Sequence, residues 1–230
     1  MIQTAVDDDL RTVTMDRPQR RNALTPDGLD ALETALAEAT EPVVYLTGAG
    51  GAFSAGADLD VVADLDADEA EAFARHGQRV ARALADYDGA VVAGVDGPAR
   101  GGGVELALAC DIRLATPRAT FAETGVSLGL FGAWGGTARL PRVVGEGEAM
   151  DVALSGRTVD ADAALRMGLV SRIVDDPRSV ADTIADNDAA TLRTIKRLLR
   201  ADGDRETRER REAAAFAERI ADFDPDDRNR

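Results

Sequence analysis

The sequence predicts an α/β protein, because short apolar runs typical of buried strands alternate with segments of helical periodicity. The apolar run at 91–95 is followed by a glycine-rich loop at 97–103 and then by a helical pattern at 103–109. An earlier apolar run at 43–47 leads into a second loop of small residues at 48–59. This repeated order of strand, loop and helix favours a layered α/β fold over an all-helical one.

The first part of the chain contains all the predicted strands. Thr25-Pro26 begins a helix that continues to about Ala39, because proline is tolerated in the first turn of a helix. A polar helix at 66–88 carries apolar residues at Ala70, Phe73, Val80 and Leu84. In chain order, the other elements expected here are strands at 10–15, 43–47, 91–95 and 111–115 and a helix at 103–109.

From Glu146 onward the pattern is mostly helical. The segment 182–201 has apolar residues at helical spacing, and a charged amphipathic helix is expected at 204–222. The last residues, 224–230, are expected to fray. The apolar residues of the 182–201 segment are Ile184, Leu192, Ile195, Leu198 and Leu199.

Composition limits the class of protein. The chain has 230 residues, of which 45% are hydrophobic, enough for one large domain or for a core with a small appendage. It lacks an apolar run of the roughly 18 residues that a membrane span needs, and it opens without a secretory signal. The single cysteine, Cys110, excludes an internal disulfide and is expected to be buried as a packing residue. These features predict a cytoplasmic protein.

The charge balance is strongly acidic. The chain has 42 acidic and 27 basic residues, a formal net charge of -15. Nucleic-acid binding requires a basic face and is therefore not expected. Because the acidic residues are spread along the chain and Lys196 is the only lysine, the composition is the one that a salt-adapted cytosol favours.

The two glycine-rich loops indicate a site for a developing negative charge. Three consecutive glycines at 101–103 let a ligand approach the backbone closely, and the helix that follows begins with free N–H groups. One backbone N–H from each loop is the arrangement that stabilises an oxyanion. Glu105 lies one turn into the helix, where its carboxylate can reach the same ligand.

At these residues the sequence resembles the crotonase (enoyl-CoA hydratase/isomerase) superfamily. Five groups of residues occur in family order and cover roughly residues 10 to 200. They are Arg17-Pro18 with Asn22-Ala23-Leu24, then 53–59, then 101–106, then Gly135-Gly136-Thr137 with 139–142, and finally 164–170.

The resemblance implies a crotonase-like spiral of ββα repeats at 1–145. It implies a helical C-terminal region at 146–230 that serves in trimerisation and forms part of the CoA site. The expected partners are an acyl-CoA thioester and further copies of the chain, as a homotrimer or a dimer of trimers. The family's further C-terminal segment, aromatic and basic, has no counterpart in this sequence.

The resemblance also implies roles for individual residues. The backbone N–H groups of Ala57 and Gly102 would hold the thioester oxygen as it becomes an enolate oxygen, and Glu105 would act as the catalytic acid/base. Trp134 either contacts the acyl chain or simply packs. Lys196, Arg197 and Arg200 either meet phosphates or are solvated. CoA contacts are expected from Arg21, Ala23, Ala55, Asp58 and Leu59.

One position departs from the family pattern. Two-glutamate hydratases carry a second glutamate twelve residues before the threonine of the Gly-Gly-Thr group, and here that position is Gly125. Glu123 lies two residues earlier, on the same face if this segment is a strand, and is a candidate second acid/base. Hydration of a 2-enoyl-CoA is the first expectation, and double-bond isomerisation with one glutamate is the second. A non-catalytic acyl-CoA-binding member is the third.

Other chemistries are not indicated. The segment 48–53 lacks the last glycine of a dinucleotide fingerprint, and the chain has no phosphate-binding Gly-Lys-Ser/Thr loop. His76 is the only histidine and lies in a polar helix, so neither a Ser-His-Asp triad nor a metal site is expected. No cofactor is expected, because CoA is part of the substrate.

Overall fold

The fold is built on a six-stranded mixed sheet. The structure is a computed structural model and describes residues 1–221 and 223, so the fraying expected at 224–230 lies outside it. The first two strands are antiparallel, and every later neighbour in this sheet is parallel. The strands, in spatial order, are β1 (Ile2–Asp7), β2 (Leu10–Met15), β3 (Val43–Gly48), β4 (Ala90–Val95), β6 (Ile112–Ala115) and β9 (Arg172–Ile173).

A second sheet is small and lies next to the glycine-rich loop at 101–103. Its short strands are β5 (Pro98–Arg100), β7 (Thr120–Ala122) and β8 (Val159–Asp160). The sequence pattern did not predict these three, nor β1 and β9. Strands of two or three residues are too short to show periodicity, and most of β1 is exposed.

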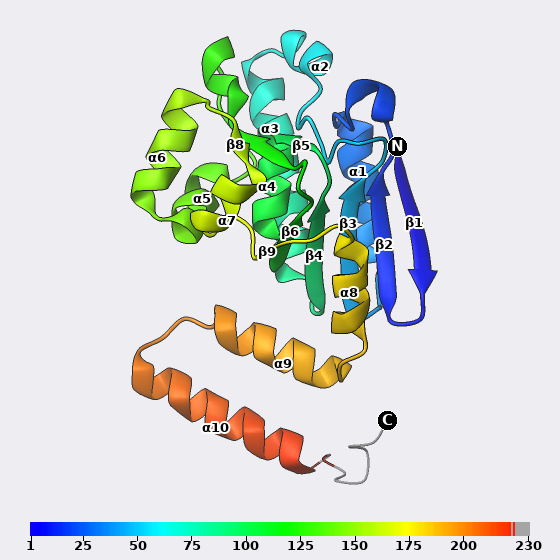
Figure 1. The fold of residues 1–230 in the computed structure, drawn as a ribbon, viewed down its shortest axis with the longest axis vertical. Coiled ribbons are helices and arrows are strands. Elements are labelled where there is room, and N and C mark those ends of the chain that lie inside the picture. Colours follow the sequence, from blue (N-terminus) through cyan, green and yellow to red (C-terminus); the bar gives the residue numbers. More distant parts are fainter. Residues whose placement is uncertain (222, 224–230) are drawn as a thin grey trace.

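Helices surround the sheets (Figure 1). Helix α4 is buried at every position, which explains why it shows no polar face in the sequence. The helices are α1 (Pro26–Ala37), α2 (Leu59–Ala63), α3 (Ala67–Asp86), α4 (Gly102–Ala109), α5 (Gly136–Val144), α6 (Glu146–Ser155), α7 (Ala161–Arg166), α8 (Pro177–Ala185), α9 (Ala189–Arg200) and α10 (Arg205–Ala221), with 3-10 turns η1 (Pro18–Arg20) and η2 (Thr124–Leu128).

Two expectations about helices are wrong in detail. The helical segment at 182–201 is divided, because α8 ends at Ala185 and the Asp188 side chain accepts a hydrogen bond from the Thr191 N–H and begins α9. In α3, Phe73, Val80 and Leu84 are buried as predicted, whereas Ala70 is exposed. The short polar connection between α8 and α9 contains a capping signal that apolar spacing alone does not reveal.

Of the two last helices, α9 contacts β4 of the main sheet. Figure 1 shows α9 and α10 as a hairpin at one end of the molecule, and α10 contacts α9. The segment just after residue 145 is part of the two sheets, because β8 pairs with β7 and β9 pairs with β6. In residues 1–221 and 223, no helix is both long and apolar enough to cross a membrane.

Candidate active site

Two buried polar side chains shape the first glycine-rich loop. The Asn22 amide donates to the carbonyls of Ala49 (2.9 Å) and Ala52 (2.8 Å), while its oxygen accepts from the Arg17 N–H. The Ser54 hydroxyl donates to the Asn22 carbonyl (2.9 Å) and accepts from the Gly56 N–H (3.1 Å). These bonds fix the path of the backbone up to Ala57.

The two loops come into direct contact. Gly56 has a φ of +80°, and a Cβ on it would lie 2.6 Å from the Gly102 nitrogen, so only glycine fits there. The bridge between Leu24 and Ala57 uses the Gly56 carbonyl and the Asp58 N–H and leaves the Ala57 N–H out of that pairing. Gly102 is the first residue of α4, so its N–H has no partner within the helix.

Both loops line one cavity of about 400 Å³. It brings together six of the residues expected in the site, and α3 provides part of its wall through Ala70, Phe73 and Ala74. The six are Ala55, Ala57, Leu59, Gly102, Glu105 and Trp134.

The Glu105 carboxylate is held in the wall of this cavity by backbone hydrogen bonds. Only 1% of the residue is exposed. Its Oε1 accepts from the backbone N–H groups of Trp134 (2.9 Å) and Gly136 (2.6 Å), and a Cβ on Gly136 would lie 2.8 Å from the same oxygen. Burial raises the pKa of Glu105 above its ordinary value, and the two backbone hydrogen bonds oppose that rise. A carboxylate with a raised pKa suits proton transfer near neutral pH.

Trp134 both packs and lines the cavity. Its ring meets Phe73 edge to face, with centroids 5.8 Å apart. It also covers Gly77 and Gly102, since a Cβ on either glycine would lie within 2.4 Å of the indole. The two alternatives that the sequence left open are therefore compatible.

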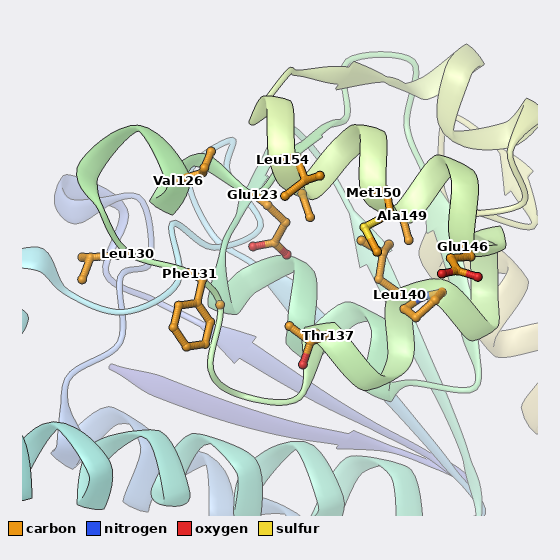
Figure 2. A pocket seen from close by; sticks show the side chains of 14 residues that line it. Glu123, Val126, Leu130, Phe131, Thr137, Leu140, Glu146, Ala149, Met150 and Leu154 are labelled. Atoms are coloured by element: carbon orange, nitrogen blue, oxygen red, sulfur yellow. The ribbon is translucent and has the colours of Figure 1, made fainter.

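Glu123 faces a second cavity, of about 500 Å³. Figure 2 shows its side chain pointing into an otherwise largely apolar space between η2 and α6, with Phe131 and Thr137 nearby. Its Oε1 is enclosed and has no hydrogen-bond partner among the described residues. Burial, with a smaller contribution from the charge of Glu105, raises the pKa of Glu123 to about 8. The segment 130–132 lines both cavities.

A comparison with known proteins shows the family of this chain. Residues 6–221 match the family model described as enoyl-CoA hydratase/isomerase. The chain belongs to the enoyl-CoA hydratase/isomerase family. The resemblance to the crotonase superfamily and the predicted crotonase-like α/β fold are thereby confirmed.

Individual members of the enoyl-CoA hydratase/isomerase family are similar over most of the chain. The short-chain-enoyl-CoA hydratase of Clostridium acetobutylicum is 35% identical over 198 residues, which cover 81% of this chain and 76% of that protein. The solved enoyl-CoA hydratase of Bacillus anthracis has a TM-score of 0.88 at 30% identity, covering 94% and 89% of the two chains. That of Thermoplasma volcanium has a TM-score of 0.89 at 31% identity, covering 96% and 92%.

The residues expected to contact CoA in this family form a strip beside the first loop. The Arg21 carbonyl accepts from the Ala55 N–H (2.8 Å), and Ala23 is buried. The Asp58 carboxylate is already bound by the guanidinium groups of Arg17 and Arg20, which hold the pKa of Asp58 below its ordinary value although burial acts in the opposite direction. Asp58 therefore positions the loop with its side chain.

The three basic residues near the end of α9 have different surroundings. Lys196 Nζ donates to the carbonyls of Tyr87 (2.6 Å) and Gly89 (2.8 Å) and lies 2.9 Å from an Asp111 oxygen. Neither sequence expectation for Lys196, a phosphate contact or a solvated charge, is correct, because the ammonium fastens α9 to the edge of the core. Arg200 also pairs with Asp111, and Arg197 is exposed.

Sequence reasoning missed the positioning roles of Asn22 and Ser54. Both belong to groups of residues that carry the family resemblance, so their presence was noted without a function. A signal was available for Ser54, which is a polar residue within a small, apolar stretch, whereas Asn22 follows two arginines and does not stand out. Their partners lie about thirty residues away in the chain, and only the fold identifies them.

Proposed function

We propose that this chain adds water across the double bond of a 2-enoyl-CoA thioester. The observation that carries the proposal is a single cavity lined by Glu105 and by the two loops that bear Ala57 and Gly102. The two backbone N–H groups form the oxyanion hole for the thioester oxygen. One such donor is worth about 10²–10³ in kcat.

In this mechanism Glu105 handles the proton. Its carboxylate takes a proton from water as the water oxygen bonds to C3 and the double-bond electrons move to the thioester oxygen. Glu105 then returns the proton to C2 as the enolate collapses. Atoms and charge balance with one carboxylate and no cofactor.

A double-bond isomerase is the second candidate, and one observation favours it. Glu123 lines a different cavity from Glu105, and the family's second glutamate position is Gly125. An isomerase needs one carboxylate to move a proton between two carbons. Comparison of crotonyl-CoA with a 3-enoyl-CoA as substrates separates the two reactions. CoA-thioester binding without turnover of either substrate would indicate the non-catalytic member.

The decisive variant is Glu105→Gln, which keeps size and removes the basic site. General acid–base catalysis contributes about 10²–10⁴-fold, so turnover should fall by that order while CoA-thioester binding persists. Loss of crotonyl-CoA absorbance measures turnover, and Glu123→Gln is the matched control. If Glu105→Gln is mild and Glu123→Gln is severe, the assignment of Glu105 as the proton carrier is wrong.

The setting of the enzyme is part of the proposal. We expect a homotrimer or dimer of trimers in which the exposed apolar faces of α9 and α10 pack on other copies. We expect CoA to lie along the strip of Arg21, Ala23 and Ala55. The single cysteine is buried, which suits a reducing cytoplasm.

A further inference from the structure

His76, the only histidine of the chain, is buried between two helices. It lies on α3, and 8% of the residue is exposed. Its Nε2 is enclosed and makes no hydrogen bond of acceptable geometry to any described residue. A buried ring nitrogen without a hydrogen bond is costly unless another interaction replaces the lost hydration.

Two carboxylates from the neighbouring helix face this nitrogen. Asp30 and Glu33 lie one turn apart on the same side of α1, which packs against α3. The distance from Nε2 to Asp30 Oδ1 is 3.0 Å, and the distance to Glu33 Oε2 is 3.6 Å. One ligand atom from each of the three residues lies within 4.8 Å of the other two.

The longer of these two distances matches the spacing of ligand atoms around a shared cation, and the shorter lies slightly below it. Zinc bonds of about 2.0–2.2 Å in tetrahedral geometry place ligand atoms roughly 3.3–3.6 Å apart. The Asp30 side chain is 68% exposed, so the remaining coordination position can be filled by water. Arg79 Nε lies 3.7 Å from Oε1 of Glu33, which leaves Oε2, the oxygen nearer His76, for the cation.

We propose that Asp30, Glu33 and His76 form a binding site for a divalent transition metal of the zinc class. The neutral imidazole supplies the nitrogen ligand that zinc prefers and magnesium does not. The metal fastens α1 to α3. Because Phe73 and Gly77 of α3 pack against Trp134, it also stabilises one wall of the cavity that contains Glu105.

The sequence offers a clean test, because His76 is the only histidine and Cys110 the only cysteine, and Cys110 is buried. The untagged chain is titrated with zinc chloride in about 1 M potassium chloride, where the Debye length is about 3 Å and diffuse binding to the acidic surface is screened. We expect saturation at one equivalent. The Hε1 and Hδ2 signals of the single imidazole in the NMR spectrum should shift in step with it.

Thermal unfolding gives an independent measure. At a hundredfold excess of zinc over Kd, Tm should rise by roughly 5–10 °C, and magnesium should not reproduce the rise. His76→Gln and Asp30→Asn should each abolish the saturable binding of zinc and the rise in Tm. Asp175→Asn, which removes an exposed carboxylate outside the cluster, should leave them unchanged.

Several results would overturn the site. They are an imidazole signal that does not respond to zinc, a magnesium effect equal to that of zinc, and a zinc response that survives His76→Gln. If the variants fail to fold, the NMR titration of the unmodified chain still decides. The test does not depend on turnover, so its outcome is separate from the proposed hydratase activity.

Discussion

At the scale of single residues, two glutamates near each other have different surroundings. Glu105 is pinned by two backbone N–H groups, whereas Glu123 has an enclosed oxygen without a hydrogen-bond partner among the described residues. Both have a raised pKa, but only Glu105 has donors that stabilise its ionised form. This difference makes Glu105 the better proton carrier and Glu123 a group that is mostly neutral near pH 7.

The stability of the protein should depend on whether the Glu123 side chain is protonated. Its pKa is about 8 in the folded chain against an ordinary value of 4.5. Between these values the folded state holds a proton that the unfolded state has lost, so the free energy of unfolding falls as pH rises through that window. Glu123→Gln removes this loss. We expect the variant to be more stable than the parent by a few kcal/mol at about pH 9, and nearly equal at about pH 4.5, since each pKa unit corresponds to about 1.4 kcal/mol.

Denaturant unfolding at several pH values measures the effect. Glu146→Gln, at an exposed position on the same cavity, is the matched control. A parent and a Glu123→Gln variant with parallel stability curves would contradict the raised pKa.

At the scale of elements, the site depends on the contact between two loops that follow β3 and β5. Gly56 touches Gly102 so closely that no side chain fits between them. Asn22 and Ser54 hold the first loop in place, and the indole of Trp134 covers the second. In the proposed mechanism, the oxyanion hole therefore depends on two loops packed together.

The prediction at this scale compares two glycines with nearly the same backbone. Gly56 and Gly51 have φ values of +80° and +81°, but a Cβ on Gly51 meets nothing within 4 Å. Alanine at either position should cost about 1–2 kcal/mol of backbone strain. Only Gly56→Ala should also push the loops apart and lower kcat by about 10²–10³-fold.

Turnover per folded molecule, together with Tm, separates strain from lost catalysis. Equal losses of turnover in Gly51→Ala and Gly56→Ala would show that the contact between the loops does not matter for catalysis.

At the scale of the whole molecule, charge and shape act in opposite directions on assembly. The net charge of -15 repels neighbouring copies, and salt screens that repulsion. The α9–α10 hairpin presents apolar side chains away from the core, including Phe216 (67% exposed) and Ile220 (52% exposed). Burial of such a face stabilises association by about 25 cal/mol for each Å² of apolar surface.

We therefore expect a trimer or hexamer whose assembly is favoured by salt. Light scattering at low and high salt should show the oligomer most clearly at high salt. Phe216→Ser combined with Ile220→Ser should shift it towards monomer, whereas Val6→Ser, at a similarly exposed apolar position (54%) on β1, should not. A monomer at both salt concentrations would contradict the assembly.

The sequence alone determined the features that depend on local order. The α/β class followed from apolar runs and helical periodicity, and the family followed from short groups of residues in a fixed order. Glu105 was predicted as the acid/base from its position shortly after three glycines, which the sequence shows by itself.

Only the tertiary structure decided which distant groups meet. The separate cavity of Glu123, the anchoring of Lys196 by two carbonyls and Asp111, and the approach of His76 to α1 join residues from different elements. Such contacts depend on how helices and sheets pack, whereas sequence periodicity reports only which face of an element is apolar. For this reason the sequence indicated the two glycine-rich loops but not the particular contacts around each carboxylate.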